Sequence, residues 1–188
     1  MNFTEAVNAV LAKVKRPDKI ELARLEVNAA LMLYSSQMDS PRDLVEGIYT
    51  SPNPADFAHI VALSTFPRYR KMDWLRYTGT REYICPLDSR LLGSTQNIQD
   101  KYYLAGDSFK INLSRAVANL EYSYYAWPVT LTDAAPLHWQ LEGNWPAIVS
   151  KAAAKVFVDI GDAEAAARAE AAAAVHFLSF QGDIIRGT

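Results

Sequence analysis

A chain of 188 residues, half of them hydrophobic, can bury a sizeable core, and this composition excludes an intrinsically disordered protein. The net charge of −2 and the pI of about 5.9 do not suggest a dedicated nucleic-acid binder. The single cysteine, Cys85, excludes an intrachain disulfide and a cysteine metal cage. No segment approaches the uninterrupted apolar length of a membrane span, so we expect no membrane partner.

The N-terminal region predicts two helices. Residues 3–14 place their apolar side chains on one helical face, and Pro17 ends that helix. The second predicted helix spans roughly residues 18–37, and its apolar positions cover more than one face. A helix of that kind is buried between partners, either within the fold or between subunits.

The middle of the chain alternates between turn-forming residues and strand-like runs. Residues 38–57 are rich in glycine and proline around one such run, 44–50. Further period-two runs occupy 59–63, 71–78, 81–84, 101–105, 108–113 and 120–127. The Gly106-Asp107 pair indicates a tight turn, and residues 87–97 are expected to hold a short helical turn. We predict a small antiparallel sheet of four to six strands.

The C-terminal region returns to helical patterns. Pro128 ends the last aromatic strand, and residues 129–138 are expected to form a loop. A third helix is predicted over 139–159, interrupted or started by Pro146. After a cap at Gly161-Asp162 the alanine-rich segment 162–180 predicts a fourth helix, whose small side chains allow close helix packing.

These elements predict an α+β fold, in which a helical bundle from both ends of the chain accompanies a small central antiparallel β-sheet. We expect one domain with a helical lobe formed by residues 1–37 and 139–180. The β lobe is expected over about 44–128, and a C-terminal tail over 181–188.

One motif suggests an enzyme. The Gly-Asp-Ser triplet at 106–108 superficially resembles the nucleophile block of GDS-type hydrolases. A serine nucleophile needs a base and a group that orients the base, which that family supplies as Asp-x-x-His near the C-terminus. His138 and His176 each have alanine three residues earlier, so we favour a hairpin turn.

The remaining candidate groups favour structural roles. His59, His138 and His176 are isolated in sequence, and nothing in their spacing supports a metal site. Cys85 stands before Pro86 without a paired histidine, as a structural thiol does. The sequence therefore predicts no catalytic residue, no metal ligand and no cofactor.

A basic run with interleaved aromatic residues extends over 68–81. Its cations are Arg68, Arg70, Lys71, Arg76 and Arg81, and its aromatic residues are Tyr69, Trp74 and Tyr77. This composition suits contact with phosphates, but a solvated strand face carrying alternating charges is the favoured interpretation. Ion pairing with an acidic neighbour across a protein interface is a third possibility.

Four segments in order carry a resemblance to a known family. They are an asparagine–alanine stretch of the second helix (26–36), a proline–arginine strand entry (66–77), a hairpin leading to the aromatic strand (102–113 with 120–133), and the final helix pair (145–178). Their order and spacing resemble those of the head-to-tail adaptor (connector) proteins of tailed bacteriophages, especially short-tailed ones. The resemblance covers most of the chain.

The resemblance implies a structural virion protein and not an enzyme. Such proteins form a ring, typically of twelve copies, docked under the portal of the capsid, with an axial channel for DNA. The implied partners are further copies of the chain, the portal protein, a tail tube or nozzle protein, and DNA that passes without sequence-specific binding. The implied location is the head–tail junction of the virion, after synthesis in the bacterial host cytoplasm.

The expected partner and interface residues lie in the C-terminal tail and the basic run. They are Ile184, Ile185, Arg186, Arg68, Arg70, Lys71, Arg76, Trp74 and Trp127. The adjacent isoleucines of the tail are expected to dock on the portal or the next ring, because they form an apolar pair in a polar end. The alternatives are a monomeric nucleic-acid- or protein-binding domain that uses the basic strand 68–81, and a small hydrolase built on Ser108.

Overall fold

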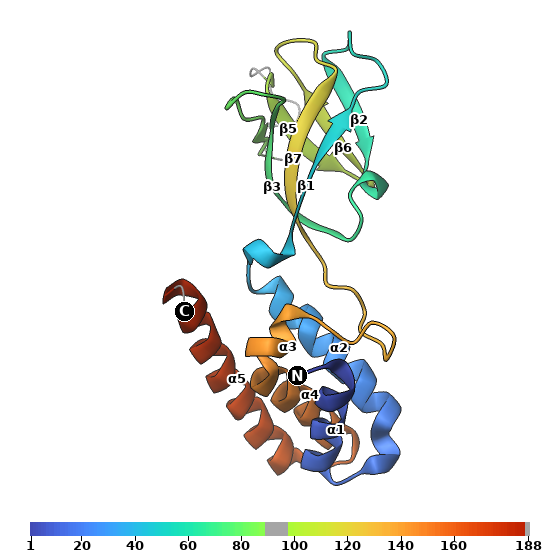
Figure 1. Ribbon diagram of the computed structural model, residues 1–188, viewed down its shortest axis with the longest axis vertical. Helices are drawn as coiled ribbons and strands as arrows, with labels where there is room; N and C mark the ends of the chain where they lie inside the picture. Colours follow the sequence, from blue (N-terminus) through green and yellow to red (C-terminus); the bar gives the residue numbers. More distant parts are fainter. Residues whose placement is uncertain (89–97, 187–188) are drawn as a thin grey trace. The chain divides into compact units, whose positions relative to one another are not determined.

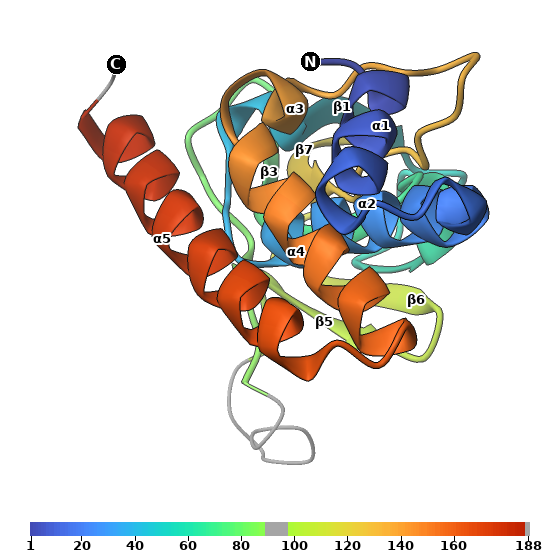
Figure 2. The ribbon, with the colours of Figure 1, turned by 90° about the horizontal axis from the view of Figure 1, so that it is seen from below.

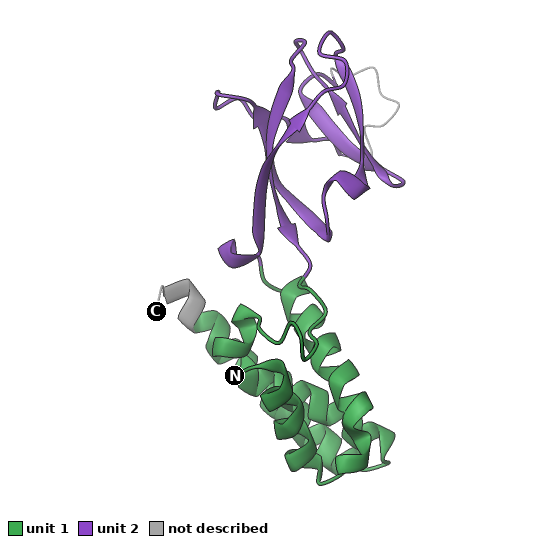
Figure 3. Ribbon diagram, turned by 45° about the vertical axis from the view of Figure 1, so that its right-hand side comes forward, with its two compact units in different colours: residues 1–38, 128–188 green, residues 39–127 purple. Residues whose placement is uncertain are grey.

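The computed structural model describes residues 1–88 and 98–186, with residues 183–186 described by their backbone alone. The chain separates into two compact units, a helical unit formed by residues 1–38 and 128–188 and a β unit formed by residues 39–127 (Figure 3). They correspond to the helical and β lobes expected from the sequence, and the α+β fold class is confirmed.

The helical unit contains two N-terminal and three C-terminal α-helices among the described residues (Figure 1). They are α1 (Phe3–Val14), α2 (Ile20–Ser36), α3 (Trp139–Gly143), α4 (Trp145–Asp159) and α5 (Ala163–Arg186). Asn2 and Glu5 form a capping box that begins α1, since each side chain accepts a hydrogen bond from the other residue's backbone N–H. A 3₁₀ turn at Pro17–Lys19 separates α1 from α2, as Pro17 predicts.

The core of the helical unit is built around α4. Its buried side chains include Ile148, Ala152 and Val156, and α4 packs against α1, α2 and α5. Figure 2 shows α4 between α1 and α5. The small alanine side chains of α4 and α5 allow the two helices to approach closely. Each fully buried leucine or valine of this core contributes roughly 1.5–3 kcal/mol through removal from water.

The helix predicted over 139–159 is divided in two, as Pro146 suggested. Gly143 ends α3, and Asn144 lies between the two helices. Pro146 lies in the first turn of α4, where its missing N–H costs nothing. The ring of Phe180 on α5 covers Gly143, and a Cβ atom on that glycine would meet Phe180 Cε2 at 2.6 Å.

Gly143→Ala is therefore expected to destabilise the fold by about 2 kcal/mol, because the added methyl group displaces the Phe180 ring. Urea unfolding followed by circular dichroism measures this change. Gly182→Ala on α5 is the matched control, since nothing lies within 4 Å of a Cβ atom there. Equal stability of the two variants would contradict the packing of Phe180 on Gly143.

The predicted C-terminal tail is helical over most of its length, which corrects the expectation of a separate segment over 181–188. The backbone of α5 continues to Arg186, so the helix predicted over 162–180 extends further. Ile184, Ile185 and Arg186 belong to this last turn, and their side chains lie outside the described residues. Their proposed docking role stays a prediction.

The β unit contains seven strands within the described residues. They are β1 (Leu44–Thr50), β2 (Ala58–Ala62), β3 (Tyr69–Tyr77), β4 (Cys85–Pro86), β5 (Lys101–Ala105), β6 (Ser108–Asn112) and β7 (Asn119–Ala126). In one sheet β7 pairs antiparallel with β1 and β3; the other has the order β2-β6-β5-β4 and is antiparallel except for the β4–β5 pair (Figure 1).

The strand predictions are confirmed except at one place. Residues 81–84 form only a single bridge, between Tyr83 and Arg76, and the short strand β4 follows at Cys85–Pro86. The sequence predicted one sheet of four to six strands, whereas the seven described strands form two sheets. Alternation in the sequence does not show which strands pair. The helical turn expected over 87–97 falls largely outside the described residues.

Aromatic side chains fill the core of the β unit. Phe66 makes edge-to-face contacts with Phe109, Tyr122 and Tyr124, with ring centroids 4.9–5.6 Å apart. Tyr124 donates a hydrogen bond of 3.0 Å to the Pro67 carbonyl, which satisfies its buried hydroxyl. The dense aromatic strand of the sequence is thus mainly a packing element.

Candidate functional site

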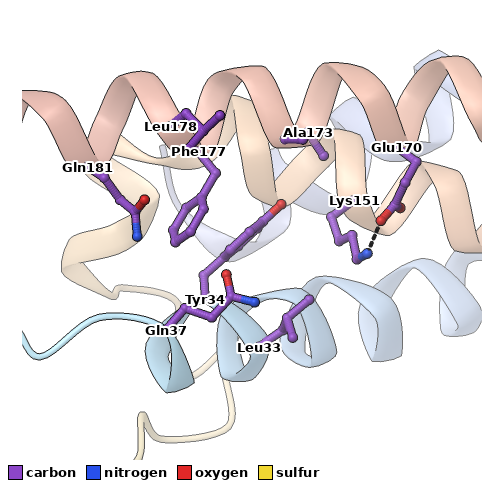
Figure 4. Close-up of a pocket in the computed structure, with 10 residues that line it drawn as sticks. Leu33, Tyr34, Gln37, Lys151, Glu170, Ala173, Phe177, Leu178 and Gln181 are labelled. Atoms are coloured by element: carbon purple, nitrogen blue, oxygen red, sulfur yellow. Dashed lines mark hydrogen bonds and ion pairs between the residues drawn. The ribbon is translucent and has the colours of Figure 1, made fainter.

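A groove lies between α2 and α5 in the helical unit (Figure 4). Its volume is about 440 Å³. Apolar side chains dominate its lining, with polar groups toward its two ends: Leu33, Tyr34, Gln37, Lys151, Glu170, Ala173, Ala174, Phe177, Leu178 and Gln181. This arrangement suits an apolar helix or peptide from a partner.

Two stacked aromatic rings join the walls of the groove. The Tyr34 and Phe177 centroids lie 4.3 Å apart with an interplanar angle of 26°, and both side chains are buried. Figure 4 shows the two rings between the helices. Burial, aided by the negative charge of Glu170, raises the pKa of Tyr34 to about 12. The hydroxyl therefore stays protonated at neutral pH.

An ion pair between Lys151 and Glu170 lies at the other end of the groove (Figure 4). Lys151 extends from α4, and its side chain is largely buried, while Glu170 extends from α5. This pair neutralises the charge at that end, so the groove presents apolar walls and neutral polar groups. Among the described residues, no cluster of metal ligands lies in the groove.

Local signals place α5 beside α4. Gly161 has a φ of +80°, the left-handed conformation that favours glycine after a helix end. Asp162 then caps α5 by accepting a hydrogen bond of 2.9 Å from the Ala165 backbone N–H. The predicted C-cap and N-cap are therefore confirmed. Ala165, Ala169 and Ala173 form the buried face of α5.

A second apolar stripe runs along the opposite face of α5. Its members recur every three or four residues and are exposed: Ala167, Ala171, Ala174, Val175 and Leu178. Val175 is 66% exposed and Leu178 is 67% exposed. The stripe is therefore an exposed apolar surface on α5.

The outward face of α2 has the same character. Leu25 is 63% exposed, Ala29 is exposed, and Leu22, Met32 and Leu33 are only partly buried. This confirms that the second helix is apolar on more than one side. Leu33 of this face, and Ala174 and Leu178 of the α5 stripe, also line the groove between the two helices.

Most of the basic run lies on β3 and its entry, where Arg70, Lys71 and Arg76 are paired with carboxylates of the β unit. Asp39 Oδ2 accepts a hydrogen bond of 2.6 Å from Lys71, and Asp39 Oδ1 lies 3.3 Å from Arg70 Nη1. The Arg70 guanidinium also lies 5.2 Å from the Tyr125 ring centre and 5.8 Å from that of Trp127. Asp39 was not among the predicted residues, because it precedes the run by about thirty positions.

The second half of the run has its own carboxylate. Glu121 on β7 accepts a hydrogen bond of 2.7 Å from Arg76, whose guanidinium lies 4.4 Å from the ring centre of Trp74. Arg68 and Trp127 are joined at the base of the sheet, where Arg68 Nη1 donates to the Trp127 carbonyl at 2.6 Å. These contacts stabilise the β unit and favour the ion-paired strand face over direct DNA contact by the basic run.

Guanidinium groups also lower the pKa values of several carboxyls. Hydrogen bonds from arginine lower the pKa of Glu121, of Asp133 and of Asp18, the last to about 2. A carboxyl with a lowered folded-state pKa stabilises the fold above its unfolded-state pKa of about 4, and this stabilisation is lost as the pH falls through the folded-state value.

We therefore expect the free energy of unfolding to be steady from about pH 7 to pH 5 and to fall below about pH 4. Arg76→Gln removes the partner of Glu121 and should make that acid-induced fall smaller. Urea midpoints at several pH values measure the effect, with Lys110→Gln as a control outside this pair. An unchanged pH profile in Arg76→Gln would contradict the assignment.

The hydrolase candidate has no assembled triad around it. Ser108 Oγ donates to the neighbouring Asp107 carboxylate at 3.2 Å. His59 is buried and pairs through Nδ1 with Ser51 Oγ at 3.2 Å. Gly106 has a φ of +64°, which confirms the tight turn. Among the described residues no group of three or more His, Cys, Asp or Glu side chains is arranged to hold a metal ion.

The described helices include none that is both long enough and apolar enough to cross a membrane.

The groove was missed in the sequence because its walls come from segments far apart in the chain. The only signal for it was the excess of apolar positions on both helices. No protein-family model and no curated protein matches the chain.

Proposed function

We propose that this chain is a structural virion protein that forms the head-to-tail adaptor ring of a tailed bacteriophage. The ring docks on the portal, contacts the tail and leaves a channel for DNA. Two things support the proposal: the order of segments that resembles the adaptor family, and the two outward apolar faces of the helical unit.

The outward faces of α2 and α5 are the observation that carries the proposal. In a two-fold symmetric dimer, both copies use the same face. In a head-to-tail contact, each copy uses two different faces. Here the leucine-rich face of α2 and the alanine-rich face of α5 are two different exposed surfaces of one unit. Large side chains of one copy packing over small ones of the next would generate a closed ring, for which the resemblance implies about twelve copies.

The groove between α2 and α5 borders both faces, because Leu33, Ala174 and Leu178 also line it. Its apolar lining suits an amphipathic helix or an extended segment of the portal or tail protein. Its small volume fits a few anchoring side chains and not a whole domain.

The test is the mass of the purified protein by native mass spectrometry, alone and mixed with the portal ring. Stoichiometric binding of many copies to the portal is the expected result. A chain that stays monomeric and ignores the portal would overturn the proposal.

Ala171→Glu places a carboxylate in the outward face of α5 and is expected to abolish ring formation, because an unpaired charge would be buried between copies. His176→Glu, also exposed on α5 but on the side of the helix away from the stripe, is the matched control and should assemble normally. Circular dichroism confirms that both variants fold. Assembly of Ala171→Glu at wild-type yield would exclude this face as the seam.

A further inference from the structure

The sheet formed by β2, β6 and β5 has an outer face that the proposed ring does not use (Figure 1). Register places Lys110 between Ile60 and Tyr103, and Asn112 between Ala58 and Lys101. A third row completes the face with Ala62, Ser108 and Ala105. The alternate residues of these strands, such as Val61, Phe109 and Ile111, are buried, so the lysines lie on the solvent side.

This face carries positive charge without compensation. None of its nine positions holds an acidic residue, and Lys110 is exposed. Among the described residues, neither Lys101 nor Lys110 makes an ion pair. The acidic residue nearest to Lys110 in the sequence is Asp107. It lies in the turn that precedes β6 and accepts a hydrogen bond from Ser108.

Several acids of the β unit are engaged by other groups. Asp39 binds Lys71, Glu121 binds Arg76 and Glu82 binds Arg115. Asp100, which precedes Lys101, accepts hydrogen bonds from Tyr77 Oη and from the Ser114 backbone N–H. The β unit as a whole is near neutral. Several of its acids are engaged elsewhere in the unit, and Lys101 and Lys110 on the β2-β6-β5 face stay without an acidic partner among the described residues.

The shape of the face also suits a polyanion. Ile60 and Tyr103 flank Lys110 directly, and its diagonal neighbours include Ala58, Ala62 and Ala105. Lys101 and Lys110 are diagonal neighbours across β5 and β6, about 7–8 Å apart by sheet geometry. This spacing is close to that of successive phosphates along one strand of a nucleic acid.

We propose that the outer face of β2, β6 and β5 binds the phosphate backbone of double-stranded DNA without reading its sequence. The lysines contact phosphates, and Tyr103 supplies a further polar edge. The proposal depends on the β unit alone and stands or fails independently of the ring. Were the ring also correct, its copies would multiply a weak contact on one long DNA.

The strength of the contact follows from the number of lysines. Two phosphate contacts give a slope of about −2 for the logarithm of the binding constant against the logarithm of the salt concentration. A single chain should therefore bind weakly, with a Kd of about 10⁻⁴ M, and only at low salt.

The experiment measures binding of the full chain to a fluorescent 30-base-pair duplex (about three helical turns) by anisotropy, at salt concentrations from about 20 to 200 mM. Wild type should bind with the expected slope. The Lys101→Gln/Lys110→Gln double variant should lose at least tenfold in affinity at the lowest salt. Lys15→Gln/Lys155→Gln removes two exposed lysines of the helical unit and is the charge-matched control.

Cys85 gives a second readout that needs no variant. It is exposed, it is the only cysteine, and in register it lies beside Lys101 on β5. Bound DNA should slow its reaction with an uncharged maleimide. The proposal is overturned by absence of salt-dependent binding, by equal loss in both double variants, by unchanged Cys85 reactivity, or by polyglutamate that binds more tightly than DNA.

Discussion

Phe177→Ala is expected to lower the free energy of unfolding by about 3–4 kcal/mol. The phenyl ring is buried and stacks on Tyr34 at 4.3 Å, so its loss leaves a cavity where α5 meets α2. The groove between these helices should widen as well, because the stack is the contact that joins its two walls. Urea unfolding followed by the fluorescence of Trp139 and Trp145, both in the helical unit, measures the change.

The neighbouring residue gives an internal control for this prediction. Leu178 is 67% exposed, so Leu178→Ala should change the stability of the isolated chain by less than about 0.5 kcal/mol. In the proposed ring the same variant should weaken assembly, since Leu178 belongs to the outward stripe of α5. If Leu178→Ala destabilised the isolated chain as much as Phe177→Ala, the assignment of buried and outward faces would be wrong.

The helices of this chain could be predicted closely because their boundaries depend on local chemistry. The capping box of Asn2 and Glu5, the proline at 17 and the pair Gly161-Asp162 act within a few residues of themselves. The end of α5 was missed because the polar residues after 180 resemble a tail, although the backbone continues as a helix to Arg186.

The arrangement of the strands could not be predicted in the same way. Alternation identified β1, β5, β6 and β7, but β7 pairs with β1 and β3, which stand some seventy and fifty residues earlier in the chain. Pairing over such separations depends on packing of the aromatic core, which no local pattern encodes. The division into two sheets was therefore invisible in the sequence.

The candidate sites show the same limit. The cations of the basic run were evident, but their partners Asp39 and Glu121 lie outside it, so the sequence favoured a solvated strand face and did not show the ion pairs. Lys101 and Lys110 were not predicted as a site, because they belong to two different strands of a hairpin. The two-residue turn at Gly106 sets the register of that hairpin, and this register places both lysines on the same face of the sheet.

Asn28→Asp is the second substitution expected to have a large effect, about 3 kcal/mol of destabilisation. The Asn28 side chain accepts a hydrogen bond of 2.7 Å from the Leu131 backbone N–H and donates one of 3.1 Å to the Leu131 carbonyl. It thereby fixes the loop that follows Pro128 onto α2, and Leu131 is buried in the core of the helical unit. A carboxylate keeps the first bond but turns an acceptor toward the Leu131 carbonyl.

Three variants separate this geometry from a general effect of charge. Asn28→Ala loses both bonds without repulsion and should cost less, about 2 kcal/mol. Asn8→Asp, an exposed position on α1, adds the same charge and should have almost no effect. The order of stability expected in urea is wild type, Asn8→Asp, Asn28→Ala and Asn28→Asp. If Asn28→Asp were as stable as Asn8→Asp, the paired hydrogen bonds to Leu131 would not hold the loop, and the packing of Leu131 alone would have to do so.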